Sequence, residues 1–181
     1  MSEQAELLVL GLGNLLCGDD GLGAAAVARL DRDWEAPEDV RVLDGGTLGL
    51  ALLPHLEDAR AVILVDAVLD DATPGSFVRL TGEEVGPAVA HRLSPHQIGV
   101  ADLLDGARLR GRYPQQLVLL GLVPSTLDLS LDRSPGVEAG LEGLTERIVA
   151  EARSMGHEFV RRPDHQRALR DRGHVARIFG L

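Results

Sequence analysis

Hydrophobic residues of this chain gather into short, nearly uninterrupted runs. Residues 7–12 (LLVLGL), 61–67 (AVILVDA) and 116–123 (QLVLLGLV) are almost wholly apolar, and residues 40–44 (VRVLD) form a shorter run. Continuous runs of this length are typical of parallel strands that are buried on both faces of a sheet. We therefore predict that these four segments are the parallel core strands of one sheet.

Apolar residues at helical spacing occupy much of the chain between and after the runs. The expected helices are Gly21 to Asp33, a short helix that ends near Leu56, Ile98 to Leu109, and a long final helix from Ser134 and Pro135 to a stop at Gly156. Residues 76–80 alternate weakly between apolar and polar, which predicts an edge strand. Strands that alternate with helices indicate one α/β domain, a three-layer sandwich with a mostly parallel, twisted sheet flanked by helices.

The segment 157–181 differs in composition from the rest of the chain. It holds six arginines against three acidic residues, a net charge of +3, whereas residues 1–156 carry −13. We therefore divide the chain into an α/β protein domain, 1–156, and an arginine-rich C-terminal tail, 157–181. The sparse apolar residues of segment 157–181 indicate a loosely ordered tail. The positive charge of this segment also suits an appendage that folds back on the acidic body or contacts a partner.

The overall charge and composition narrow the choice of partners and compartment. A formal net charge of −10 disfavours nucleic acid and anionic membranes, because both attract basic surfaces. No stretch approaches the roughly 20 apolar residues that span a bilayer, and the N-terminal residues MSEQAE carry acids where a signal peptide carries basic residues. The single cysteine, Cys17, agrees with a reducing compartment. We expect a cytoplasmic protein that binds neither nucleic acid nor membrane.

Acidic and imidazole side chains follow the predicted strands. Asp19 and Asp20 come after the first strand, Asp66 lies near the end of the third, and His96 precedes a helix. Because the carboxyl ends of parallel strands form one crevice, Asp20, Asp66 and His96 can converge there. Two carboxylates and one imidazole suit a borderline divalent ion such as Ni²⁺ or Zn²⁺ and leave coordination positions open. The zinc signatures HExxH and paired CxxC are absent from the sequence.

Each of these side chains also has a purely structural interpretation. Asp19 or Asp20 can cap the helix that follows, and we expect that one of them does. Asp66, as an acid within an apolar run, must be paired, metal-bound or at the exposed tip of its strand. His96 taken alone fits a surface histidine, and the other five histidines are assigned to surface or packing roles.

A dinucleotide site fits the pattern less well. Gly11 and Gly13 after a strand, with Asp44 at the end of the next, resemble part of a dinucleotide-binding fingerprint. Leu16 replaces the third glycine of that fingerprint. The aspartates that follow also put negative charge where a pyrophosphate needs N–H donors.

Two nucleophile hypotheses are weaker still. Ser94 and His96 lie two residues apart on one loop, which is poor geometry for a nucleophile and its base, and no GxSxG occurs. Cys17 could be a reactive thiol or a soft nickel ligand, but a lone cysteine beside a strand end is usually a small apolar residue.

Four segments resemble, in order and spacing, the motifs of the nickel-iron hydrogenase maturation endopeptidases. They are residues 11–23 (GLGNLLCGDDGLG), residues 44–47 (DGGT), Asp66 within ILVDAV, and residues 94–97 (SPHQ). The resemblance runs from about residue 7 to residue 155. It implies that Asp20, Asp66 and His96 are the nickel ligands and the catalytic residues, the same trio that the residue types select.

The resemblance also implies a function and a partner. A nickel-dependent endopeptidase of this family removes the C-terminal extension of a nickel-iron hydrogenase large-subunit precursor after nickel insertion. The nickel would be carried by the substrate and would serve as a check that insertion is complete. Because the sequence shows no clear nucleophile, general base or oxyanion hole, the alternative is a non-catalytic binding or assembly module for the nickel-loaded large subunit.

Overall fold

A five-stranded sheet in the order β3-β1-β4-β6-β5 forms the centre of the molecule. The computed structural model describes residues 5–90 and 95–164, except for the side chains of residues 90 and 95–98. The strands are β1 (Ala5–Leu12), β3 (Val40–Gly46), β4 (Ala59–Ala67), β5 (Phe77–Thr81) and β6 (Gln116–Leu122). β1, β3, β4 and β6 are parallel, and β5 pairs antiparallel with β6. The predicted core strands and edge strand are confirmed.

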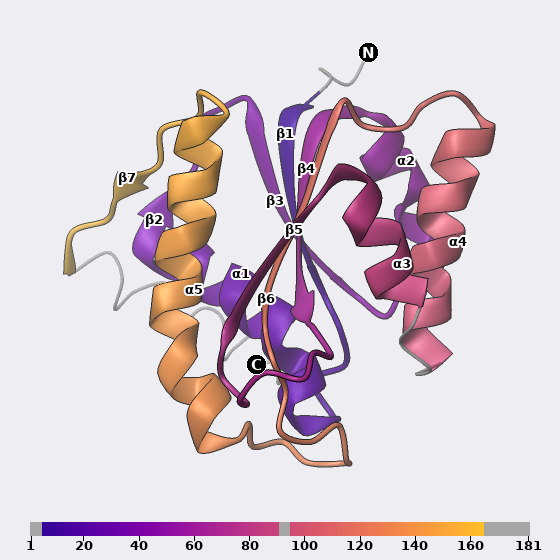
Figure 1. The fold of residues 1–181 in the computed structure, drawn as a ribbon. Coiled ribbons are helices and arrows are strands. Elements are labelled where there is room, and N and C mark those ends of the chain that lie inside the picture. The colour runs from indigo at the N-terminus through magenta and orange to yellow at the C-terminus, as the bar shows by residue number, and fades with distance from the viewer. Residues whose placement is uncertain (1–4, 91–94, 165–181) are drawn as a thin grey trace, which may run out of the picture.

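Helices cover both faces of this sheet (Figure 1). The helices are α1 (Leu22–Asp33) and α5 (Pro135–Ser154) on one face, and α2 (Leu53–Glu57), α3 (Val85–Ala90) and α4 (Pro95–Leu109) on the other. Alternate residues of β1 serve the two faces: Leu7 and Val9 pack in the core under α1 and α5, and Leu8 and Leu10 in the core under α2 to α4. Burial on both faces explains the continuous apolar runs, and the three-layer α/β sandwich is confirmed.

Several short helical segments were not predicted from the sequence. They are α3 and the 3₁₀ helices η1 (Gly18–Gly21) and η3 (Gly82–Glu84), whereas the 3₁₀ helix η2 (Gly49–Leu52) and α2 together form the short helix predicted to end near Leu56. None is long enough to repeat an apolar position over two turns, so periodicity gives no signal for them. No helix in the described part of the chain is long and apolar enough to cross a membrane.

The start of the arginine-rich segment packs against the body of the domain. β7 (Val160–Arg161) pairs antiparallel with β2 (Trp34–Glu35), and Phe159 is buried in the core under α1 and α5. The interpretation as a loosely ordered tail is therefore wrong for residues 157–164, which fold back on the body. Residues 165–181 lie outside the described part of the chain.

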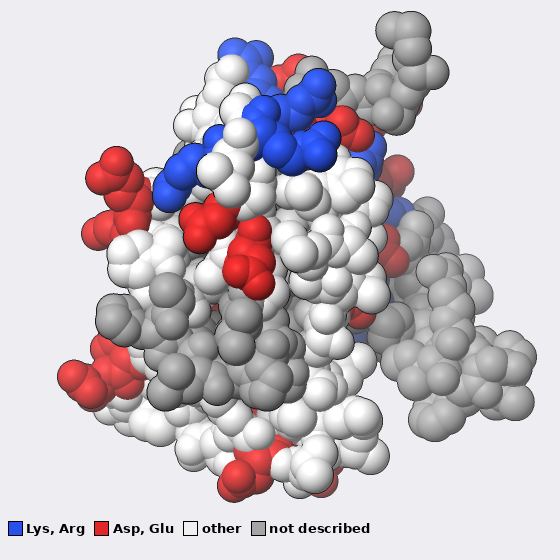
Figure 2. All heavy atoms as spheres, turned by 90° about the vertical axis from the view of Figure 1, so that its right-hand side faces the viewer, with Lys and Arg blue, Asp and Glu red and all other residues white. Residues whose placement is uncertain are grey.

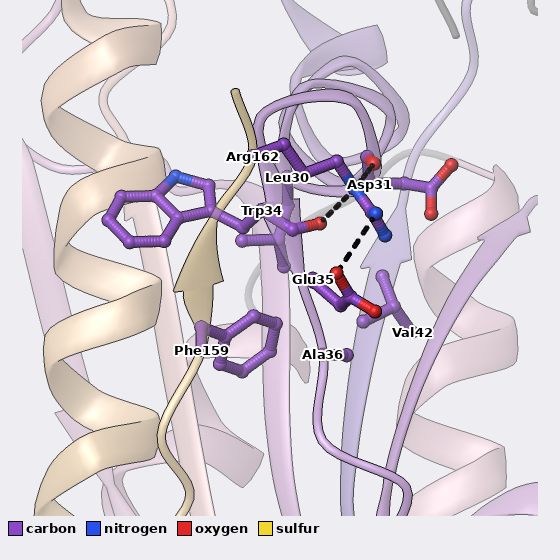
Figure 3. A pocket seen from close by; sticks show the side chains of 8 residues that line it. All are labelled: Leu30, Asp31, Trp34, Glu35, Ala36, Val42, Phe159 and Arg162. Carbon is purple, nitrogen blue, oxygen red and sulfur yellow. Dashed lines mark hydrogen bonds and ion pairs between the residues drawn. The ribbon is translucent and has the colours of Figure 1, made fainter. Parts of the chain in front are cut away.

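Arg162 fastens this segment to the end of α1. Its backbone N–H donates to the Asp33 carbonyl oxygen at 2.8 Å, and its Nε donates to the Trp34 carbonyl oxygen at 3.0 Å. These bonds satisfy carbonyls that the end of a helix leaves without intrahelical partners. Figure 3 shows the Arg162 side chain running from Trp34 toward Glu35, beside a hollow of about 260 Å³ that Phe159 also lines.

Candidate active site

Loops from the carboxyl ends of β1, β3, β4 and β6 meet at one edge of the sheet, the lower end in Figure 1. Gly23, in the first turn of α1, lies so close to the strands that a Cβ there would overlap the carbonyl oxygens of Leu12 and Val65. Only glycine permits this approach. α1 therefore begins directly against β1 and β4, and the acids that precede it are held beside the end of β4.

Asp20 and Asp66 converge beside Gly13. Gly13 has a φ of +107°, and a Cβ built there would overlap the carbonyl oxygen of Asp20 and lie 3.6 Å from Oδ1 of Asp66. Both aspartates are almost fully buried, with 1% and 3% of their surface exposed. The structure thus places the backbone of Asp20 and the side chain of Asp66 next to the same glycine at the carboxyl edge.

Backbone donors fix one oxygen of each carboxylate. The N–H of Asn14 donates to Asp20 Oδ2 at 2.8 Å, and the N–H of Ala67 donates to Asp66 Oδ1 at 2.7 Å. A buried carboxylate is tolerated only with such partners, and a charge-assisted bond of this length is strong. The Asp20 side chain is therefore held by the loop that follows β1, and the Asp66 side chain by the last residue of β4.

His96 belongs to the first turn of α4, and its side chain lies outside the described residues. The predicted helix begins at Pro95 instead of Ile98. A Cβ on Gly99, one turn further on, would lie 3.0 Å from the Cα of Gly49, which begins η2 after β3. The start of α4 therefore lies at the carboxyl edge, the same edge as Asp20 and Asp66 (Figure 1).

Asp19 does not cap the helix that follows it, and neither does Asp20: no side chain caps η1 or α1. The expectation that one of these acids is a helix cap is wrong. Asp19 instead accepts hydrogen bonds from a distant loop, residues 123–134 between β6 and α5. Its donors are the N–H groups of Ser125 (2.7 Å), Thr126 (3.3 Å) and Ser134 (2.7 Å) and the Ser134 hydroxyl (2.8 Å).

These contacts determine the charge state of Asp19. Burial by itself would raise its pKa, but the donors from Ser134, Ser125 and Thr126 outweigh burial and hold the pKa below the ordinary carboxyl value of 3.8. Asp19 is therefore a buried, ionised anchor for the β6–α5 loop. Sequence analysis missed this loop because no local pattern links residues 115 positions apart.

The residues of the weaker hypotheses are placed as follows. Asp44 is exposed, and its Oδ1 accepts the N–H of Gly46 at 3.0 Å in a turn. Cys17 is half-buried, and its backbone forms an isolated bridge with Ser130. Ser94 lies outside the described residues.

Among the side chains that the structure describes, which exclude that of His96, no group of three or more His, Cys, Asp or Glu could hold a metal ion.

Comparisons with known proteins agree on one family. A family model described as "Hydrogenase maturation protease" matches residues 24–151. The hydrogenase 2 maturation protease of Escherichia coli K12 is 36% identical over 157 residues, which cover 86% of this chain and 96% of that protein. The hydrogenase expression/formation protein HupD of Rhodobacter capsulatus is 39% identical over 158 residues, covering 86% of this chain and 75% of that protein.

Solved structures give the same result for the fold. The hydrogenase-maturating endopeptidase HybD from E. coli superposes with a TM-score of 0.83 at 36% identity, covering 87% of this chain and 98% of that one. The [NiFe] hydrogenase maturation protease HybD from Thermococcus kodakarensis superposes with a TM-score of 0.66 at 29% identity, covering 81% of this chain and 99% of that one.

Proposed function

We propose, from the premise that this chain belongs to the hydrogenase maturation proteases, that it removes the C-terminal extension of a nickel-iron hydrogenase large-subunit precursor. Membership confirms the resemblance noted in the sequence, and it makes the chain a peptidase. The alternative of a non-catalytic assembly module is weaker, because the family model, the hydrogenase 2 maturation protease of E. coli and the solved structures are described as proteases or endopeptidases.

The observation that carries the proposal is the buried pair Asp20 and Asp66 beside Gly13. Buried carboxylates away from a hydrophobic core's centre, at the carboxyl edge of a parallel sheet, are typical of sites that bind or react. Neither acid caps a helix, and neither is exposed to solvent, which leaves a paired or a metal-bound role for Asp66.

The donor set fits nickel that arrives with the substrate. Asp20 and Asp66 supply two oxygens, and we propose His96, in the first turn of α4 at the same edge, as the nitrogen donor. Such an O,O,N set suits Ni²⁺ and leaves coordination positions for groups of the precursor. Bound there, the ion would supply Lewis acidity toward the scissile carbonyl or a water molecule.

The chain's own contribution is to hold this donor set ready. Asn14 and Ala67 donate backbone N–H groups to the carboxylates, so little side-chain freedom is lost when a metal-bearing substrate arrives. The turn Asp44–Thr47 lies beside Gly13, whose N–H donates to the Gly46 carbonyl oxygen at 3.1 Å. Glycines there let a peptide approach the backbone closely.

We also propose that this reaction takes place in the cytoplasm. The single cysteine agrees with a reducing compartment.

Mass spectrometry of a purified nickel-loaded precursor tests the proposed function. Incubation with this protein should release one C-terminal peptide and reduce the precursor's mass accordingly. A stable complex with no loss of mass would support the assembly module and overturn the protease assignment for this pair.

A further inference from the structure

Exposed leucines gather at the carboxyl edge around the acid pair. Of the nine exposed large hydrophobic side chains in the described part of the chain, six lie in the loops that follow β1, β3, β4 and β6. We call these six the leucine rim: Leu15, Leu16, Leu48, Leu69, Leu129 and Leu131. Exposed apolar side chains that cluster in this way mark an interaction site, because their exposure to water is unfavourable unless a partner covers them.

Backbone hydrogen bonds join the loops that follow β1, β3 and β6. The N–H of Ser130 donates to the Leu16 carbonyl oxygen at 3.0 Å, and the N–H of Gly18 donates to the Ser130 carbonyl oxygen at 2.8 Å. Leu15 and Leu16 therefore lie beside the loop that carries Leu129 and Leu131. The β3 loop joins them through the bond from Gly13 to Gly46.

Asp19 fixes the most exposed part of the leucine rim. Its four hydrogen bonds hold both ends of the segment from Ser125 to Ser134, and Leu129 and Leu131 lie between these ends. These leucines are 85% and 77% exposed although their loop is anchored to a buried acid. A preformed apolar surface loses little conformational entropy when a partner binds.

The charges at this edge are acidic. Exposed aspartates lie in the same loops as the leucine rim or at the end of β3: Asp44, Asp70, Asp71, Asp128 and Asp132. The one arginine described in these loops, Arg133, pairs with Glu138 at 2.8 Å. Figure 2 shows the arginines visible on its face at the upper end of the molecule, away from the carboxyl edge. A matching partner surface is therefore apolar with basic residues around it.

We infer that the leucine rim is the docking surface for the folded body of the precursor, which it grips through an apolar patch fringed by basic residues. This inference rests on the proposed function. The leucine rim lies in the loops of the sheet edge that also holds Asp20 and Asp66, so a protein whose peptide reaches these acids approaches the same loops. A second copy of this chain is a poorer occupant, because the aspartates around the rim would repel their own counterparts.

Steady-state cleavage of nickel-loaded precursor tests the docking surface. The double variant Leu129→Ser/Leu131→Ser should raise KM by at least about tenfold, because the apolar surface that two leucines bury against the precursor is lost, with kcat within about twofold. The matched control, Leu109→Ser/Val160→Ser, removes two exposed side chains remote from the edge and should leave both constants unchanged. Higher salt should raise the wild-type KM, because the acidic fringe is screened.

Binding separates failure of the docking surface from failure of the proposed function. In an Asp66→Asn background, the rim substitutions should weaken binding of the precursor by at least about tenfold relative to that background alone. Loss of binding without any cleavage by the wild-type chain would support the docking surface and overturn the protease assignment. Unchanged KM and binding in the rim variant would overturn the docking surface. So would a wild-type dimer that the rim substitutions dissociate, because the rim would then be a self-association interface.

Discussion

Asp19 and Ser134 are joined by two hydrogen bonds, 2.7 Å from the Ser134 N–H and 2.8 Å from its hydroxyl, across 115 positions of the chain. Ser134 is also the residue that precedes α5. The acid at the start of one helix thus fixes the entry to another, and it does so one residue away from the proposed nickel ligand Asp20. The two neighbouring aspartates therefore differ in their contacts: Asp19 accepts donors from the distant loop, and Asp20 accepts the N–H of Asn14.

Replacing Asp19 should damage stability more than loss of a helix cap would. Asp19→Asn puts an amide N–H₂ group among four donors and removes a buried charge that accepts from all of them, which should lower the free energy of unfolding by roughly 2–3 kcal/mol. A helix cap would cost only about 1 kcal/mol. Urea denaturation measures the difference. Asp70→Asn, whose carboxylate accepts one bond in an exposed turn, is the control and should change little.

Asp66→Asn should abolish processing and leave the fold intact. The amide oxygen can still accept the Ala67 N–H, so the end of β4 keeps its geometry, while the negative charge needed for a metal donor is lost. Cleavage of nickel-loaded precursor and thermal unfolding report the two properties. Cleavage at the wild-type rate by this variant would remove Asp66 from the site.

Asp20→Asn should have the same effect for the same reason. The amide oxygen can keep the bond from the Asn14 N–H, and the donor charge disappears. Asp19 and Asp20 are thereby separated by experiment: the first substitution should lower stability, and the second should stop processing at nearly unchanged stability. Equal losses of stability in both variants would contradict this division.

His96→Ala should abolish processing if this side chain is the nitrogen donor. The control is His55→Ala, which removes a histidine on α2 whose described partner is Arg41 at 3.5 Å. Processing should persist in the control and vanish in the His96 variant, with far-UV circular dichroism unchanged in both. Full activity of the His96 variant would leave Asp20 and Asp66 without a third protein ligand.

Sequence patterns predicted the fold well because burial on both faces leaves continuous apolar runs, as in Leu7 to Leu12 and Ala61 to Ala67. They predicted the edge where Asp20 and Asp66 meet because parallel strands end together. They failed where a partner is distant in the chain. Asp19 was predicted as a local helix cap, but its partners lie in a distant loop. The arginine-rich segment was predicted as a tail because its one buried apolar residue, Phe159, stands among charged residues.

The last prediction concerns where the nickel resides before cleavage. Asp20, Asp66 and His96 offer three donor groups, two carboxylates and an imidazole, and Cys17, the only thiol, is placed in the loop beside Ser130. Such an incomplete set should hold free nickel weakly, whereas thiolates of the precursor would complete the coordination, so affinity comes from both proteins together. The isolated protein should therefore lose nickel on dialysis, as metal analysis would measure. It should also leave nickel-free precursor uncut even when free nickel is supplied to the protease alone. A preparation that keeps one nickel per chain through dialysis and cuts the nickel-free precursor would make the metal the enzyme's own cofactor.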